Sequence, residues 1–435
     1  MVQLRVDSLT LRNFRNYEKL QVNLDPLLTV IVGDNGAGKT AIVDALAIAA
    51  GSYLLGFDLA PGNKPTISQD DARLVLKEFG DNVENRAIYP VTVEATGVVD
   101  NESISWSRSL NRRGGRTTLK DASDIYELSK KAFSEVSSEF PSSRTLPIVS
   151  YYSTGRLWAQ KRDKKTLTTN RILREDGYAS ALDVHADEKR LFKWLKKNTL
   201  ISLQKETPVT SLKAVQKTIE DALSSVTKSN ENSVYFDVES DQLMVQYQNA
   251  NQEVRLPFHN LSDGYRSALG LIADIAYRMA TLNPQLGEKA TQETDGIVLI
   301  DEVDLHLHPR WQSQILSDLR RLFPLVQFVV TTHAPHVISS VKRENIRILS
   351  SSSSFLPSNE TFGRDAGSIL REVMHVNERP DEIVKLIEQA HEALTSGSFT
   401  HARRIIDKIE NKIGSNDPEL SSLKTTLFLE NTLTD

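Results

Sequence analysis

The chain has 435 residues, of which 39% are hydrophobic and 25% charged, which is the composition of a globular protein and not of a disordered or fibrous one. It contains no cysteine, so disulfides, thiolate zinc sites and cysteine nucleophiles are excluded, and a cytoplasmic location is favoured. The net charge of −5 excludes a general attraction to nucleic acid, so a contact with DNA or RNA needs a local basic patch. We find no apolar run of membrane-spanning length and no signal-peptide pattern, so no membrane partner is expected.

The N-terminal segment predicts strands that lead into a glycine loop. Alternating or continuous apolar residues predict strands at 4–6, 9–11, 20–22 and 28–32. The loop at 33–40 (GDNGAGKT) follows the last strand and precedes a helix-like run that ends at Ala50. Strand, glycine loop and helix in this order are the context that a phosphate-binding P-loop requires.

The residue types of this loop explain the chemistry that is expected of it. Glycines let successive backbone N–H groups turn toward an anion, and the N-terminus of the helix adds partial positive charge. Lys39 would reach the β- and γ-phosphates of a nucleotide, and the Thr40 hydroxyl would bind Mg²⁺. The predicted nucleotide-binding residues of the loop are Asn35, Gly36, Ala37, Gly38, Lys39 and Thr40.

The next part of the chain predicts a second β region. Residues 87–119 alternate as in an antiparallel meander, with a hairpin turn signal at 111–115. A helix is expected at 122–139 and a buried strand at 147–152.

Residues 160–250 change in character and become rich in charge. Most of this segment predicts helices, followed by a hairpin at 233–248. No heptad repeat is sustained, so a long coiled-coil arm is not expected. We interpret the segment as a lid inserted into a nucleotide-binding domain.

A buried strand that ends in two carboxylates is predicted at 296–302 (GIVLIDE). This is the Walker B pattern, in which Asp301 would hold Mg²⁺ and Glu302 would polarise the attacking water. A further strand at 326–330 leads to His333, and a histidine at that strand end can hydrogen-bond a γ-phosphate.

Two shorter patterns allow both a structural and a functional interpretation. The stretch 260–267 (NLSDGYRS) opens a helix, where Ser262 and Gly264 could present a hydroxyl and backbone N–H groups to a phosphate. A simple helix cap is the alternative. His306 and His308 could belong to a metal site, but their spacing is not that of a helical zinc pair and no cysteine assists.

The last part of the chain, 381–435, predicts a separate all-helical region. Apolar residues fall on one helical face in two successive stretches, 383–394 and 399–413. Asp417 followed by Pro418 is an N-cap with proline at the first helical position, and it opens a third helix. Such stripes usually pack into a helical core, and a partner-binding surface is the alternative.

These motifs in this order resemble those of the ABC-type ATPase heads of the SMC, Rad50 and RecF class. Residues 261–265 (LSDGY) are similar to the LSGGQ signature, with Asp and Tyr in place of Gly and Gln. Asp304 matches the D-loop and His333 the switch histidine. The opening stretch 11–15 (LRNFR) also looks like that class.

The resemblance implies an α/β fold: an ABC-ATPase head with a P-loop mixed sheet flanked by helices and an antiparallel β subdomain. A short helical lid insertion and an all-helical C-terminal tail would complete it. The implied domains are an N-terminal lobe at 1–158, a lid at 159–249, a C-terminal lobe at 250–378 and a helical region at 379–435. One departure is the Q-loop, whose glutamine is missing after Tyr152, with Gln160 as the nearest substitute.

The resemblance also implies how such a head works. Heads of this class form head-to-tail homodimers, in which Ser262, Asp263 and Gly264 of one subunit would enclose the ATP that the other subunit binds. Larger rings of dimers occur in such complexes. ATP and Mg²⁺ are the implied cofactors. The implied catalytic residues are Glu302, His333 and Asp304, and the implied Mg²⁺ ligands are Thr40 and Asp301.

A narrower similarity is to PtuA, the ATPase family of Septu-type anti-phage systems, which is also found beside retrons. It rests on 151–156 (YYSTGR), on 301–309 (DEVDLHLHP) and on 362–365 (FGRD) followed by Ile369 and Leu370. Members of that family act with an HNH nuclease, PtuB, and this chain has no nuclease motif of its own. The implied function is therefore an ATPase subunit of an anti-phage defence complex that controls a partner HNH nuclease docked on its C-terminal helices.

The alternative function is a RecF- or Rad50-like DNA-repair ATPase that binds DNA directly. Its support is a basic hairpin and a charged run in the lid, namely Arg108, Arg112, Arg113, Arg116 and 161–165 (KRDKK). Charge runs are usually just solvated faces, so this support is indirect. DNA, or the RNA–DNA of a retron, is nonetheless a further candidate ligand. A transporter ATPase is a third hypothesis, against which the RecF-like N-terminus argues.

Overall fold

The structure is a computed structural model, and it divides into two compact units, Met1–Arg364 and Asp365–Asp435. It describes residues 3–59, 65–79, 82–138, 142–157, 173–182, 188–229, 231–249, 252–350 and 353–434. Gln160 and the charged run 161–165 lie outside the described residues. The four domains expected from the sequence stay a prediction, and the two units are described here one at a time.

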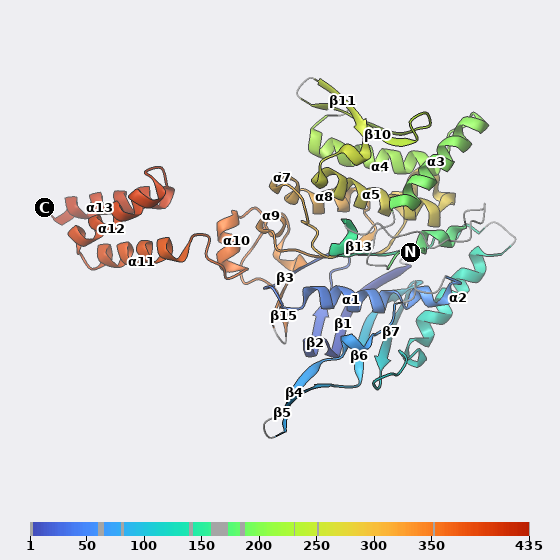
Figure 1. Ribbon diagram of the computed structural model, residues 1–435, viewed down its shortest axis with the longest axis horizontal. Helices are drawn as coiled ribbons and strands as arrows, with labels where there is room; N and C mark the ends of the chain where they lie inside the picture. The colour runs from blue at the N-terminus through green and yellow to red at the C-terminus, as the bar shows by residue number, and fades with distance from the viewer. Residues whose placement is uncertain are drawn as a thin grey trace. The chain divides into compact units, whose positions relative to one another are not determined.

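A mixed sheet forms the centre of the first unit (Figure 1). Its strands lie in the order β15 (Ser354–Phe355), β14 (Ile346–Leu349), β3 (Leu28–Val32), β13 (Val326–Thr331), β12 (Gly296–Ile300) and β8 (Ile148–Tyr152). All neighbours are parallel except β15, which pairs antiparallel with β14. Strands β3, β8, β12 and β13 are buried along their whole length, as their unbroken apolar runs predict. The carboxyl ends of the parallel strands therefore meet at one edge of the sheet.

Helix α1 (Lys39–Ala50) lies between this sheet and an antiparallel sheet (Figure 1). The second sheet has the order β2 (Tyr17–Asn23), β1 (Leu4–Phe14), β6 (Val91–Val99) and β7 (Glu102–Leu110). The indole nitrogen of Trp106 donates to the carbonyl oxygen of Ala49 at 2.9 Å and ties β7 to α1. By length and composition, Lys39–Gly56 could cross a membrane, but 78% of it is buried inside this fold.

The antiparallel sheet differs from its prediction in two places. The strands expected at 4–6 and 9–11 are one strand, β1. Its pairing with β6 shifts register between Val6 and Ser8, so that Val6 and Leu9 are both buried. The turn between β6 and β7 is at Asp100 and Asn101, both with positive φ, and not at 111–115. The sequence signal at 111–115 instead marks the turn that ends β7.

The expected insertion is mostly helical and ends in the predicted hairpin, and one strand that was not predicted follows just beyond its expected end. Beyond β8, the described elements are α3 (Glu188–Lys205), α4 (Thr210–Thr227), β9 (Ser233–Asp237), β10 (Gln242–Asn249) and β11 (Gln252–Pro257). The three strands form a small antiparallel sheet in the order β11-β10-β9, which lies above α4 and α5 (Figure 1). The remaining elements of the unit are α2 (Ser123–Val136), α5 (Asp263–Leu282), α6 (Ala290–Glu293), α7 (Pro309–Gln312), α8 (Ile315–Leu322), α9 (Pro335–Ile338) and the hairpin β4 (Leu74–Phe79) and β5 (Asn82–Ala87).

The second unit is helical, as predicted. Its elements are α10 (Ala366–Glu372), α11 (Asp381–Thr395), α12 (Phe399–Ile413) and α13 (Pro418–Thr434). The apolar stripes pack into a core of their own, which includes Ala390, Leu394, Ala402, Ile405, Ile406, Ile409, Leu420 and Leu423. The predicted cap is present, because the Asp417 carboxylate accepts from the backbone N–H groups of Glu419 and Leu420 at 3.0 and 3.2 Å.

Candidate functional site

The glycine loop connects β3 to α1 in a conformation that its sequence makes available. Gly36 and Gly38 have φ of +81° and +92°, a region that residues with a side chain rarely adopt. A Cβ atom on Gly38 would also lie 2.6 Å from the hydroxyl oxygen of Tyr17. That hydroxyl donates to the carbonyl oxygen of Ala37, so the hairpin between β1 and β2 holds the loop from one side.

Lys39 is the first residue of α1, and its side chain folds back along the loop. Its Nζ donates to the carbonyl oxygens of Gly33 and Asp34 at 2.8 and 2.9 Å. Burial lowers the pKa of Lys39, although Asp301 and Glu302 pull it the other way. The ammonium is therefore held in the loop with its charge poorly solvated, which favours the arrival of an anion.

Asp301 follows β12 and is held by hydroxyl groups from two other elements. Thr40 donates to Asp301 Oδ2 at 2.9 Å, and Thr331 donates to Oδ1 at 2.6 Å. The carboxylate is almost fully buried. A hydroxyl and a carboxylate side by side are oxygen donors of the kind that Mg²⁺ takes together with water and phosphate oxygens, so these residues fit the predicted ion.

The two other acidic residues of the site are fixed by the end of β13. Glu302 has φ of +49°, and its backbone N–H donates to Thr331 Oγ1 at 2.8 Å. A residue without glycine's freedom in this conformation is mildly strained, as is common at functional sites. The Asp304 carboxylate accepts from the Thr332 hydroxyl at 2.6 Å. Thr331 thus holds the backbone of Glu302 and Thr332 holds the carboxylate of Asp304. Sequence analysis did not single out either threonine.

His333 comes directly after these two threonines and is partly exposed. Burial and then the charge of Lys39 lower its pKa, and the carboxylates of Asp301, Glu302 and Asp304 do not offset this. The imidazole is therefore mostly neutral at pH 7, so one ring nitrogen can donate a hydrogen bond while the other accepts one.

A single cavity of about 310 Å³ brings these groups together. Its walls are formed by Arg15, Asn16, Asn35, Gly36, Gly38, Lys39, Thr40, Ala41, Asp301, Glu302 and His333. The predicted P-loop, Walker B pair and histidine therefore meet in space, as the parallel order of β3, β13 and β12 requires. Their individual roles stay predictions.

Arg15 and Asn16 line the cavity and were missed as site residues. Asn16 Nδ2 donates to the carbonyl oxygen of Gly36 at 3.1 Å. Arg15 bridges the carboxylates of Asp44 and Asp71 at 2.6 and 2.9 Å. Burial works against its charge, but the two carboxylates outweigh burial and raise the pKa of Arg15. The sequence signal was present in 11–15, where it served only as part of a family resemblance.

The predicted signature residues lie at the start of α5 and not at the P-loop cavity. Ser262 is the residue before the helix, and a Cβ on Gly264 would approach the carbonyl oxygen of His306 to 2.8 Å. Asp263 pairs with Arg266 at 2.8 Å. Ser262 and Gly264 line a different cavity, which shares no residue with the P-loop cavity.

The other sequence-based candidates have plainer outcomes. Within the described part of the chain, no three or more His, Cys, Asp or Glu side chains could together hold a metal ion, so a metal site at His306 and His308 gains no support.

Arg108 is buried against the carbonyl oxygen of Thr118, and burial lowers its pKa to about 10. The basic hairpin expected around it is therefore wrong for Arg108. Burial, and then the carboxylate of Asp44 to which it is hydrogen-bonded, raise the pKa of Tyr151 on the edge strand β8.

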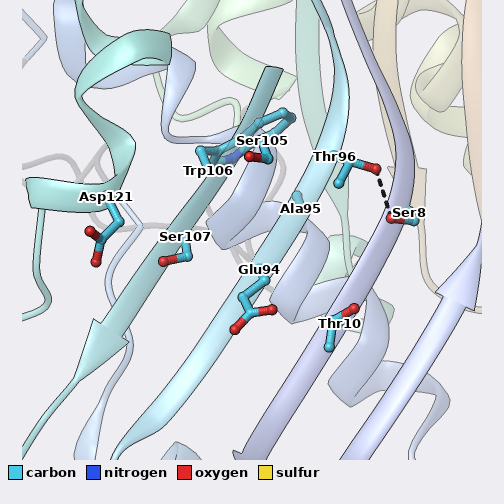
Figure 2. Close-up of a pocket in the computed structure, with 9 residues that line it drawn as sticks. All are labelled: Ser8, Thr10, Glu94, Ala95, Thr96, Ser105, Trp106, Ser107 and Asp121. Carbon is cyan, nitrogen blue, oxygen red and sulfur yellow. Dashed lines mark hydrogen bonds between the residues drawn. The ribbon is translucent and has the colours of Figure 1, made fainter. Parts of the chain in front are cut away.

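A further cavity lies on the antiparallel sheet. Figure 2 shows Ser8 and Thr10 of β1 beside Glu94 and Thr96 of β6, with the Ser8–Thr96 hydrogen bond of 2.7 Å. Its volume is about 320 Å³, and it shares no lining residue with the P-loop cavity. The hydroxyl groups of Ser8 and Thr96 satisfy each other, and we assign no ligand to this surface.

Comparison with known proteins places these observations in a family. A family model described as an AAA domain matches residues 8–227, which is half of the chain. The chain is 24% identical to the "Retron Vc95 probable ATPase" of Vibrio cholerae serotype O1 biovar El Tor, over 91% of this chain and 84% of that protein. It is 25% identical to the "Retron Ec83 probable ATPase" of Escherichia coli, over 97% and 86%. A shorter match, 36% identical over 25% of this chain and 28% of that protein, is to the "Septu protein PtuA" of Bacillus thuringiensis.

Proposed function

The chain belongs to the AAA domain family and is an ATPase, and from this premise we propose that it is the ATPase subunit of an anti-phage defence complex. Its similarity to proteins named as retron ATPases and as Septu PtuA supports the defence setting. The observation that carries the catalytic part is the single cavity that contains Lys39, Thr40, Asp301, Glu302 and His333.

Each of these groups can act on the transfer of a phosphoryl group to water. Mg²⁺, held by Thr40 and Asp301, would supply charge neutralisation at the β- and γ-phosphates. Lys39 contributes a second positive charge to the same oxygens. Glu302 is partly exposed and Thr331 holds its backbone N–H at the cavity, so its carboxylate can orient the attacking water and accept its proton. His333, being mostly neutral, can donate to the γ-phosphate while Asp304 keeps the loop beside it in place.

We infer that two copies of the chain complete each site. Ser262, Asp263 and Gly264 lie at a helix N-terminus, where backbone N–H groups favour an anion. The cavity that Ser262 and Gly264 line shares no residue with the P-loop cavity of the same chain. A head-to-tail homodimer would place the signature of one copy on the ATP of the other. Larger assemblies of such dimers are compatible with this arrangement.

The output of the ATPase is proposed to be a partner HNH nuclease of the PtuB kind. The described residues of Asp365–Asp435 form a helical unit with its own core, which makes it suited to docking. Phe428 is 68% exposed on α13. Phe428→Asp should abolish co-purification of the nuclease, and Thr426→Asp, an equal charge change on the same helix, should not. Equal recovery with both variants would contradict docking on this helix.

The ATPase and the dimer are tested together with two variants. Lys39→Ala should abolish the binding of a fluorescent ATP analogue. Glu302→Gln should bind ATP, hydrolyse it at least about a hundredfold more slowly, and accumulate as a dimer in light scattering only when ATP is present. Hydrolysis at the normal rate by Glu302→Gln would overturn the catalytic assignment, and a monomer with trapped ATP would overturn the homodimer alone.

A second candidate is direct DNA binding, as in a RecF- or Rad50-like repair ATPase. The observation in its favour is that Arg112, Arg113 and Arg116 are exposed on the turn after β7. Replacing all three by glutamine should weaken duplex DNA binding. It should also reduce the slope of the logarithm of the binding constant against the logarithm of the salt concentration by about three. Unchanged salt dependence would remove this candidate.

A further inference from the structure

The hairpin of β4 and β5 projects from the first unit beyond its antiparallel sheet (Figure 1). Among the described strands, β4 and β5 pair only with each other, whereas every other described sheet has at least three strands. The base of the hairpin is fixed beside β1, because the Arg73 N–H donates to the carbonyl oxygen of Asn13 at 2.9 Å and the Arg73 guanidinium pairs with Glu18 at 3.1 Å. An isolated two-stranded ribbon is only marginally stable in water, so a further strand would stabilise this one.

The outer edge of β5 presents backbone groups that β4 does not use. At the base of the hairpin, the N–H of Ile88 donates to the carbonyl oxygen of Arg73 at 2.9 Å. Hydrogen-bonded and non-hydrogen-bonded pairs alternate along an antiparallel ladder, so the pair of Leu76 and Asn85, three positions further along, is a non-hydrogen-bonded one. The N–H and C=O groups of Asn85 therefore point away from β4. No other described strand pairs with this edge, which leaves it open to a strand from outside the chain.

The side chains on this edge are complementary to themselves. Glu84, Asn85 and Arg86 are all exposed, and Glu84 and Arg86 lie on one face of β5 because they are two positions apart. If a second β5 lies antiparallel with Asn85 opposite Asn85, then Glu84 of each copy is opposite Arg86 of the other. The central pair is then hydrogen-bonded, and the two Glu84–Arg86 pairs are non-hydrogen-bonded, which is where opposite side chains lie closest.

The same charges select this register against its neighbours. With the two-fold axis moved to Glu84, two glutamates would lie opposite each other, and with the axis moved to Arg86, two arginines would. Like charges directly opposite each other destabilise a strand pair. Charges of one sign on an edge strand would keep all copies apart, whereas this arrangement favours one pairing.

The outer edge of β4 lacks this complementarity. The corresponding pairing of two β4 strands, centred on Leu76, would place Lys77 opposite Val75 and no positive charge opposite a negative one. The partner of the hairpin is therefore expected on the β5 side.

We propose that β5 pairs antiparallel with β5 of a second copy of this chain, around a two-fold axis at Asn85, and so joins the two hairpins into one continuous sheet. Such a pairing uses the same surface on both copies, as is usual in homodimers. It needs no nucleotide, so it goes beyond the proposed homodimer that closes on ATP and does not depend on it. A chain with both interfaces can link ATP-dependent dimers into larger assemblies.

The test is sedimentation velocity of the full chain without nucleotide. The paired segment is short, so we expect a concentration-dependent dimer with a dissociation constant of about 10 to 100 µM. Asn85→Pro removes the N–H that the central pair exchanges and should weaken the dimer about tenfold or more. The matched control is Leu76→Pro, at the opposite position on β4, whose N–H also points away from the hairpin. It should dimerise like the unaltered chain.

Exchanging the charges gives an independent test. Glu84→Arg and Arg86→Glu should each abolish the dimer, because each variant places like charges opposite each other across the two-fold axis. An equimolar mixture of the two variants should form a heterodimer, because every opposite pair then has one charge of each sign. Recovery in the mixture also shows that the hairpin of both variants is folded.

The proposal is overturned if the unaltered chain stays a monomer at about 200 µM, or if Asn85→Pro dimerises as well as Leu76→Pro. It is equally overturned if the mixture of charge variants stays monomeric, or if Lys39→Ala abolishes this dimer, since the interface would then belong to the nucleotide. At about 1 µM the dimer is dissociated, so light scattering at that concentration reports the ATP-dependent homodimer alone. Failure of either interface therefore leaves the other one intact.

Discussion

Replacing Asp295 by asparagine is expected to stabilise the first unit of the chain at neutral pH. Asp295 precedes β12, is only 7% exposed, and accepts from the backbone N–H of Gln3 through Oδ2. Its Oδ1 is buried without a partner among the described residues. Burial therefore raises the pKa of Asp295 to about 6, from an ordinary value of 3.8.

The sign and size of the effect follow from these two values. Between pH 3.8 and about 6 the folded chain keeps the proton while the unfolded chain loses it, so stability falls as pH rises through this window. Each pKa unit corresponds to about 1.4 kcal/mol, so about 3 kcal/mol of stability is present below pH 3.8 and lost above about pH 6. Asp295→Asn carries no charge to bury. Its free energy of unfolding should exceed that of the unaltered chain by up to about 3 kcal/mol at pH 7, and the two values should match near pH 4.

Urea unfolding followed by tryptophan fluorescence at several values between pH 4 and 7.5 measures this difference. All four tryptophans precede residue 365, so the signal reports the first unit and not the helical one. Asp58→Asn, which removes an exposed carboxylate of the same unit, is the control and should leave the curve unchanged. A stability difference for Asp295→Asn that does not vary with pH would refute the reasoning.

Three other variants test particular contacts. Gly38→Ala should abolish binding of the fluorescent ATP analogue in a titration, because a Cβ at this positive φ would meet the Tyr17 ring; retained affinity would contradict the loop geometry. Thr331→Val leaves one oxygen of Asp301 without its donor, so ATP hydrolysis should fall about ten- to a hundredfold in a phosphate-release assay, with binding less affected. Asp417→Ala removes the cap of α13 and should speed amide hydrogen exchange in that helix by about fivefold, or about 1 kcal/mol, while exchange in α1 serves as the internal control.

The parts of the site that the sequence could predict are those set by local chemistry. The P-loop needs only a strand, glycines that allow positive φ, and a helix start, all within 28–50. Asp301 and Glu302 are likewise marked by the strand they end. The tail was predictable because an N-cap and apolar stripes are also local signals.

The parts that the sequence could not predict depend on the register between distant strands. Ile300 pairs with Val330, and this places Asp301 beside Thr331, 30 positions later in the chain. No local pattern in 326–331 distinguishes that threonine from an ordinary strand residue. Arg108 was misjudged for a related reason. On β7 it lies on the same face as Trp106 and Leu110, and that face is buried, so the alternation of the strand outweighs the preference of a charge for water.

The charges in the P-loop cavity support a site that is incomplete in one chain. In this cavity Lys39 supplies one positive charge beside the glycine loop, whereas Asp301 and Glu302 supply two negative charges. A bound ATP would add further negative charge. Arg15 also lines the cavity, but Asp44 and Asp71 already neutralise it. Besides Mg²⁺ and Lys39, His333 is the donor proposed for the γ-phosphate, and any anionic oxygen left unpaired costs more than a paired one. The N–H groups at the start of α5, next to Ser262 and Gly264, are donors of the required kind. Because they line another cavity of the same chain, they would reach this site from a second copy in the proposed homodimer.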